Sequence, residues 1–252
     1  MKRFFRCPAA LAALLLCAAA PARSHDTWFE REPATPAGQL VFSIGTGNRF
    51  PVREFPIGYE HLVASGCRGG GADAAALAHV EDRPAALVVR SAGALDAEAG
   101  ASCWGLLKAF DVEVPADKVE LYLREIQAGP ALRASWAAMK SRGLPWRERY
   151  TKSSRIEVGG QGLRPALPMP MDIRIDTPRR PLRAGDEIGL QVLRNGAPLA
   201  DQPIEIVNHQ SPLGIWRRTD AEGRVRIALP LAGRWLLRGV DLRVSSRSPD
   251  EW

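Results

Sequence analysis

Strict alternation of apolar and polar residues marks the second half of the chain and predicts short β-strands there. Segments 172–176 and 187–194 alternate in this way, as a strand with one buried face does. Asn195-Gly196 follows directly and is a strong signal for a tight hairpin turn. Further strands, separated by turn residues, are predicted at 203–208, 217–219, 224–229 and 233–238. Short strands at this spacing indicate an immunoglobulin-like β-sandwich.

The first half shows strand patterns interrupted by a helical insertion. Strands are predicted at 39–44, 85–90, 102–110 and 154–158, with a glycine-rich loop at 69–73. Apolar residues at helical spacing predict an insertion near 117–142. Asp117 is expected to cap its first helix, over 118–126, and Gly143 to end its second, over 131–142.

A Gly- and Pro-rich stretch at 159–170 predicts a domain boundary. We therefore expect a mainly β protein with an N-terminal β domain over 25–165 and an immunoglobulin-like sandwich over 166–252. The length after residue 24 suits two small domains or one large β domain.

The N-terminus has the pattern of a secretory signal peptide over residues 1–24. Basic residues precede an apolar stretch over about 9–20, which is too short to span a bilayer. Ala22 and Ser24 fit the small-residue cleavage rule, which places the cut after Ser24. Cleavage after Ala20 or Ala22 is the alternative. The preferred cut leaves His25 as the first residue.

An N-terminal histidine carries two nitrogens, the α-amine and the imidazole Nδ1, that can close a six-membered chelate ring on a transition metal. A free α-amine has an ordinary pKa of about 7.7–8.0, so it can lose its proton near neutral pH. Imidazole suits Zn, Cu and Ni. His25 is therefore the first candidate metal ligand.

Charge argues against nucleic acid as a partner. The whole chain has a formal charge of +6, but four of its 34 basic residues and none of its 28 acidic residues lie in 1–24. The remainder carries only +2, and it shows no basic run interleaved with aromatic residues. No second apolar stretch is long enough for a membrane helix, so no stable membrane insertion of the mature chain is expected.

Cys67 and Cys103 remain after cleavage, and an isolated pair in an oxidising compartment usually forms a disulfide. A thiolate metal site is the alternative, which the long spacing and the lack of a C-x-x-C pair disfavour. Cys17 as a lipid-modified residue is also disfavoured, because Leu14, Leu15 and Leu16 precede it where a small residue is needed.

A second imidazole would complete a T-shaped set of three nitrogens, suited to Cu(II) or Ni(II). His61 and His209 are the candidates, while His79 is a weaker one; each is otherwise an ordinary loop, turn or surface histidine. Asp26 and Glu30 are expected to ligate the metal or orient the imidazole, unless they are merely solvated acids.

Other residues favour structural roles. Trp28 and Phe29 are expected to anchor the N-terminus in the core. The block 146–152 is expected to be a salt-bridged packing element rather than an anion or partner surface, and Met169 and Met171 to be packing residues rather than Cu(I) ligands. The chain has no G-x-S-x-G, H-E-x-x-H or P-loop motif, so we expect no enzyme.

Three stretches resemble a family of bacterial secreted proteins of unknown function, also described as the periplasmic component of ABC-type cobalt/nickel transport systems. They are the opening 25–30, the block 145–152, and the tail patterns at 192–199, 219–223 and 233–238. Family members commonly continue past the position that corresponds to residue 252, so the resemblance implies either that the sandwich lacks its last strand or that the chain is truncated.

The resemblance implies a periplasmic protein that binds Ni²⁺ or Co²⁺, with Cu²⁺ as a further candidate, and delivers or buffers the metal for a membrane transporter. Two rivals stay open. One is a structural or interaction protein without metal. The other is a copper enzyme that uses an N-terminal histidine brace for oxidation.

Overall fold

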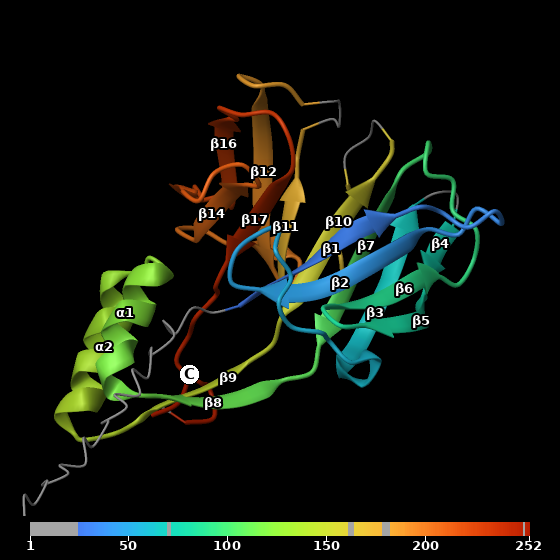
Figure 1. Ribbon diagram of the computed structural model, residues 1–252. Coiled ribbons are helices and arrows are strands. Elements are labelled where there is room, and N and C mark those ends of the chain that lie inside the picture. The colour runs from blue at the N-terminus through green and yellow to red at the C-terminus, as the bar shows by residue number, and fades with distance from the viewer. Residues whose placement is uncertain (1–24, 70–71, 161–163, 178–181, 249) are drawn as a thin grey trace, which may run out of the picture.

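The computed structural model describes residues 25–69, 72–160, 164–177, 182–248 and 250–252. Within them the chain is mainly β, with antiparallel sheets and two α-helices, as predicted (Figure 1). The predicted signal peptide, residues 1–24, lies outside the described residues. No helix in the described part of the chain is long and apolar enough to cross a membrane.

Two antiparallel sheets form the first sandwich. One has the order β1-β2-β6-β5, with bounds Asp26–Glu32, Val41–Gly47, Ala86–Ser91 and Leu77–Arg83. The other has the order β10-β7-β3-β4, with bounds Ser153–Val158, Ala101–Leu107, Leu62–Gly69 and Ala72–Ala75. The edge strands β1 and β10 lie side by side, since Ser154 Oγ donates a hydrogen bond to the Thr27 carbonyl at 2.7 Å.

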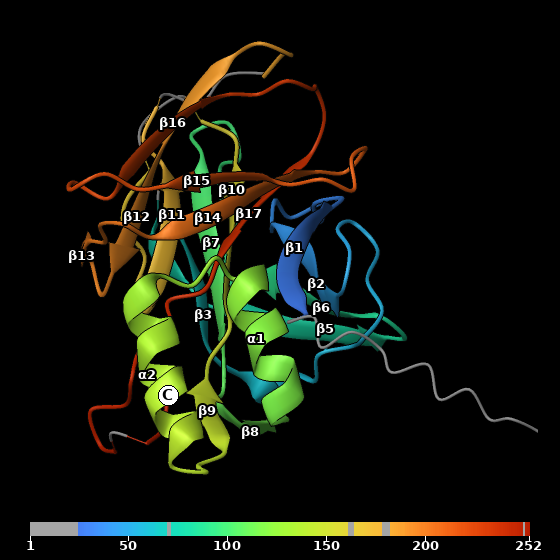
Figure 2. The same cartoon turned by 90° about the vertical axis from the view of Figure 1, so that its left-hand side faces the viewer.

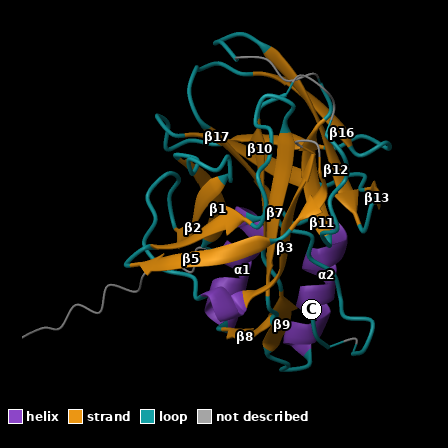
Figure 3. Ribbon diagram, turned by 90° about the vertical axis from the view of Figure 1, so that its right-hand side faces the viewer, coloured by secondary structure: helices purple, strands orange, loops and turns teal. Residues whose placement is uncertain are grey.

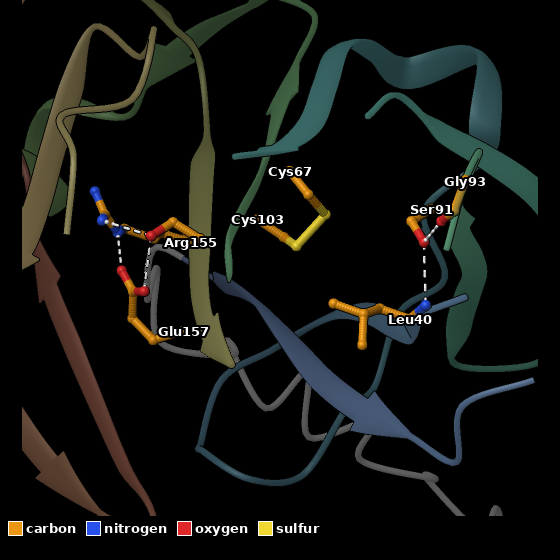
Figure 4. Close-up of a disulfide and its surroundings, with 8 residues drawn as sticks. Leu40, Cys67, Ser91, Gly93, Cys103, Arg155 and Glu157 are labelled. Atoms are coloured by element: carbon orange, nitrogen blue, oxygen red, sulfur yellow. Dashed lines mark hydrogen bonds and ion pairs between the residues drawn. A yellow bond between two sulfur atoms is a disulfide. The ribbon is translucent and has the colours of Figure 1, made fainter. Parts of the chain in front are cut away.

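Alternating apolar side chains fill the space between these sheets. Phe29 packs edge-on against Phe42, with ring centroids 5.7 Å apart. Cys67 and Cys103 lie directly opposite each other on β3 and β7 and form the predicted disulfide (Figure 4). Each large apolar side chain buried here contributes about 1.5–3 kcal/mol relative to exposure. This core fixes the position of β1 and hence of the residues before it.

The two-stranded antiparallel sheet of β8 and β9, called the hairpin below, and the two helices that connect its strands form a second layer, the hairpin layer (Figure 2). Its elements are β8 Phe110–Val114, α1 Ala116–Glu125, α2 Pro130–Ser141 and β9 Trp146–Tyr150. Trp136 and Trp146 are fully buried at its centre. The C-terminal segment returns to this layer, where Trp252 stacks on Trp146 with ring centroids 4.4 Å apart. The Trp252 N–H donates a hydrogen bond to the Arg147 carbonyl, and the Arg149 N–H donates one to the Trp252 carbonyl, so the C-terminal segment pairs with β9.

The helical insertion lies where it was predicted, but Asp117 does not cap it. The first helix begins two residues earlier than expected, after Pro115, whose fixed φ presets the start of the helix. Asp117 lies in the first turn and pairs with Lys118 at 3.3 Å. Gly143 follows α2 with φ +72°, as a residue that ends a helix does.

The second sandwich packs two further sheets around one core (Figure 3). One contains β11 Met171–Ile175, β12 Glu187–Arg194, β13 Ala197–Pro198 and β16 Arg224–Ala228; the other contains β15 Ile215–Arg218, β14 Pro203–Asn208 and β17 Trp235–Gly239. Asn195 and Gly196 both have positive φ, at 49° and 83°, which confirms the predicted tight turn. Leu190, Ile204 and Ile206 are fully buried between the sheets.

Two predicted boundaries in the first half are wrong. The strand predicted over 102–110 is two strands: β7 ends at Leu107, and β8 begins at Phe110, because the chain turns there from the sandwich into the hairpin. The predicted loop 69–73 is only partly loop, since β3 runs to Gly69 and β4 begins at Ala72. The stretch 159–170 holds no strand or helix in its described parts, and the domain boundary within it stays a prediction.

Candidate functional site

A large cavity, about 1370 Å³ in volume, lies where the two sandwiches and the hairpin layer meet. Its walls come from β1, from β9 and β10, and from β17 with the segment that follows it. Figures 2 and 3 show β1, β10 and β17 close together. Segments far apart in the sequence therefore supply its polar groups.

His25 lies directly before β1, on the wall of this cavity. Its imidazole packs edge-on against Phe55, with ring centroids 4.7 Å apart. Nδ1 of His25 is buried and has no hydrogen-bond partner among the described residues. Such an atom is costly unless something binds it. This nitrogen is therefore the candidate ligand atom.

The backbone of His25 is held in place from two sides. Lys152 Nζ donates a hydrogen bond to the His25 carbonyl at 2.6 Å. Trp28 and Phe29 are buried, at 3% and 6% exposure, which confirms that they anchor the N-terminal strand. Because the anchors fix β1, the imidazole is presented from a rigid element.

Asp26, Trp28 and Glu30 occupy every second position of β1 and therefore share one face of the strand. Phe29, which lies in the first core, points to the other face. Asp26 pairs with Arg238 of β17. Glu30 pairs with Arg234 at 3.1 Å and with Arg53 at 3.4 Å.

Asp26 and Glu30, predicted to ligate the metal or orient the imidazole, thus both have arginine partners. Since Nδ1 of His25 has no partner, neither carboxylate orients that nitrogen. The contacts of these acids with Arg234 and Arg238 join β1 to the second sandwich, whereas Arg53 lies after β2 in the first.

A buried charge network surrounds the start of β1. Burial raises the pKa of Asp26, while Arg238 beside it acts in the opposite direction. Arg238 also donates from Nε to Glu205 Oε2 at 2.7 Å. Burial lowers the pKa of Lys152, and Asp26 opposes that shift. The positive charge of Lys152 is therefore destabilised next to His25.

His61 and His209 lie apart from the cavity wall that holds His25. His61 ends the short helix η1 (Tyr59–His61) and packs edge-on against Phe110 at 6.1 Å. His209 follows β14, where its Nδ1 accepts a hydrogen bond from the Arg234 backbone at 3.1 Å. Among the described residues, no three or more His, Cys, Asp and Glu side chains group as a metal site would require.

The remaining candidates have structural contacts. His79 of β5 lies 3.4 Å from Asp82. Met169 is buried beside Trp104 and Leu167. Met171 packs against the second core.

The block 146–152 forms β9 and the turn after it. Its arginines pair with acids of β8: Arg147 with Glu113 at 3.4 Å, and Arg149 with Asp111 at 3.0 Å. These ion pairs agree with the predicted packing role of the block.

Glu148, which the sequence placed in the packing block 146–152, lines the cavity instead. Glu148 lies on the inner face of β9 and accepts hydrogen bonds from Tyr122 Oη at 3.1 Å and Trp146 Nε1 at 3.0 Å. Burial raises the pKa of Glu148. The alternation of Trp146, Glu148 and Tyr150 was a usable signal, because it places one acid between two aromatic residues on one strand face.

Comparison with curated proteins gives no match. Residues 22–240 match a family of proteins described as a domain of unknown function, DUF4198. The match extends from just before His25 through β17, so it includes both sandwiches and the helical insertion. The protein therefore belongs to the DUF4198 family.

Proposed function

We propose that the mature protein binds a divalent transition metal, Ni²⁺, Co²⁺ or Cu²⁺, through the α-amine and Nδ1 of His25. One observation supports this most directly: Nδ1 of His25 is buried at the cavity wall without a partner among the described residues. Nδ1 is the ring nitrogen that closes a six-membered chelate with the α-amine. The proposal rests on the predicted cleavage after Ser24.

The chain contributes position and electrostatics to such a chelate. Lys152 holds the His25 carbonyl, and Phe55 limits the rotation of the imidazole. Burial lowers the pKa of Lys152, and Asp26 beside it opposes that shift. Protons compete with the metal for both His25 nitrogens. Affinity therefore falls as the pH drops below about 8, where a free α-amine takes up a proton, and falls more steeply below about 6.5, where an imidazole does so too.

A chelate of two nitrogens leaves coordination positions open. Neither His61 nor His209 lines the cavity beside His25, so the described residues supply no second imidazole there. An open site can pass its metal on to a further ligand, which suits delivery or buffering. We place the protein in the periplasm, with an ABC-type cobalt/nickel transporter as the recipient, as the family resemblance suggests.

The test is a calorimetric titration of Ni²⁺, Co²⁺ and Cu²⁺ into protein whose first residue is His25, confirmed by intact mass. One comparison protein carries an extra alanine ahead of His25, which converts the α-amine into an amide. A second carries His25→Ala. The matched control is His79→Ala, which removes a histidine that is partly exposed on β5.

We expect tight binding in the parent and in His79→Ala, and its loss in the other two proteins. Equal weak binding in all four would overturn the proposal and favour a secreted structural or interaction protein. Selective copper binding with chemistry that depends on a reductant or peroxide would favour the histidine-brace enzyme. Raw affinity favours Cu²⁺ over Ni²⁺ and Co²⁺, so the order among metals does not by itself identify the physiological one.

A further inference from the structure

The hairpin layer places one acid on an otherwise apolar and aromatic face. Within the β8–β9 hairpin, Glu148 lies opposite Val112, and Trp146 lies opposite Val114. Trp146 and Tyr150 flank Glu148 at alternate positions and so share its face. The arginines of the strand, at 147 and 149, point to the other face, where they pair with acids of β8.

The Glu148 carboxylate is held by neutral donors. Tyr122 Oη binds Oε1 and Trp146 Nε1 binds Oε2, at 3.1 and 3.0 Å. No lysine, arginine or histidine within the described residues forms an ion pair with Glu148. A carboxylate oxygen can accept more than one hydrogen bond, so both oxygens keep capacity for a further donor. The two hydrogen bonds thus orient the side chain, but no positively charged side chain among the described residues pairs with its carboxylate.

Aromatic rings surround this carboxylate. Tyr122 packs edge-on against Trp146 at 5.8 Å, and Tyr150 stacks on Phe110 at 5.5 Å. The Lys152 ammonium lies 6.0 Å from the centre of the Tyr150 ring, so that ring already contacts a cation within the same cavity. A cation over an aromatic face gains energy, and more so where water is excluded.

We propose that Glu148, with Tyr122 and Tyr150, forms a binding site for a small organic ammonium ion in the cavity. The carboxylate pairs with the ammonium group, and the aromatic rings present their faces to the same positive charge. The apolar walls from Val112, Val114 and Trp252 receive the hydrocarbon part of the ligand. The volume, about 1370 Å³, is ample for such a molecule.

A metal ion fits these residues less well. Metal sites in proteins gather several ligating side chains, whereas Glu148 stands apart from any group of three His, Cys, Asp or Glu among the described residues. The site does not use the nitrogens of His25, although Lys152 contacts both His25 and Tyr150. It can therefore be tested where the proposed metal chelate is blocked.

The experiment titrates hexylammonium and tetramethylammonium into the mature protein, followed by calorimetry and by the fluorescence of the nearby tryptophans. Hexanol serves as the neutral analogue of the same length. Glu148→Gln removes the charge and keeps an acceptor oxygen. Glu113→Gln is the matched control, because it removes an exposed acid from the other face of the same hairpin. Each titration is repeated with alanine added ahead of His25.

We expect ammonium ions to bind the parent and Glu113→Gln alike, and to bind Glu148→Gln at least about tenfold more weakly. Hexanol should show no such difference. Tyr150→Leu should also weaken binding, which provides a second test if Glu148→Gln fails to fold. Absence of ammonium binding to the parent, or equal binding to both glutamine variants, would overturn the proposal. If the alanine-extended protein still binds the ammonium ions, the ammonium site does not depend on whether His25 chelates a metal.

Discussion

Asp26 and Glu148 are buried carboxylates that differ in their partners. Asp26 pairs with Arg238, whereas Glu148 accepts hydrogen bonds from Tyr122 and Trp146, which are neutral. Burial raises the pKa of both acids, and for Asp26 the nearby arginine opposes the shift. The ionised form of Glu148 is therefore the less compensated of the two, and the stability of the fold should depend on its protonation.

Replacing Glu148 with glutamine should change how stability depends on pH. The raised pKa means that the folded protein holds this proton more tightly than the unfolded chain does. Glu148 thus stabilises the fold below its ordinary value of 4.5, and that contribution is lost as the pH rises through the folded-state value. Glutamine stays neutral throughout. Thermal unfolding should therefore show the Tm of Glu148→Gln rising relative to the parent as the pH increases above about 4.5.

Glu113→Gln provides the comparison for this pH series. Its carboxylate is 62% exposed and pairs with Arg147 on the solvent side of the hairpin, where such pairs contribute little. We expect only a small change in its Tm. A Tm difference for Glu148→Gln that stays constant across the series would show that the folded protein does not favour the protonated acid.

The roles of single residues were predictable where they depend only on neighbours in the sequence. The signal-peptide pattern identified His25, and the position of Trp28 and Phe29 beside it predicted their burial. The burial of His25 Nδ1 without a hydrogen-bond partner among the described residues depends on Phe55 and on the closure of the sandwich. Neither of these has a local signature in the sequence. The place of Glu148 on the cavity wall was not predicted, because the charged block 146–152 was interpreted as one packing element and not by the alternation along a single strand.

At the scale of elements, the prediction was most accurate in the second sandwich. The ranges predicted for β12 and β14 coincide with the observed strands, because alternation and the Asn195-Gly196 turn specify them locally. The return of the C-terminal segment to the hairpin was not predictable. Trp252 reaches Trp146 across more than a hundred residues of sequence, and this contact depends on the whole chain path.

The disulfide between β3 and β7 should stabilise the first sandwich substantially. Cys67 and Cys103 are fully buried and separated by 36 residues. Loop closure of that length stabilises by about 4 kcal/mol in the chain-entropy model, and often by less. The double variant Cys67→Ala with Cys103→Ala should lose about 2–4 kcal/mol of unfolding free energy, measured in urea. The denatured mature parent should titrate without free thiols; two thiols would contradict the disulfide.

At the scale of the whole molecule, charged contacts join the two sandwiches. Arg155 of β10 binds both oxygens of Asp172 on β11, at 2.9 and 2.8 Å, and both side chains are buried. On the cavity side, Arg238 of β17 contacts Asp26 of β1 and Glu205 of β14. Because His25 directly precedes β1, the proposed metal ligand lies beside this junction.

Removing Arg238 should weaken the junction far more than removing Arg234. Arg238→Ala removes the arginine that pairs with both Asp26 and Glu205, whereas Arg234 is 57% exposed and Glu30 retains Arg53. Loss of one partner of a buried pair costs about 3–5 kcal/mol, and the 35% exposure of Arg238 reduces this to about 2 kcal/mol. Calorimetry should therefore show a Tm lower by about 5 °C for Arg238→Ala and a small change for Arg234→Ala. Equal effects in the two variants would show that burial of the Asp26 pair does not govern how the sandwiches are held together.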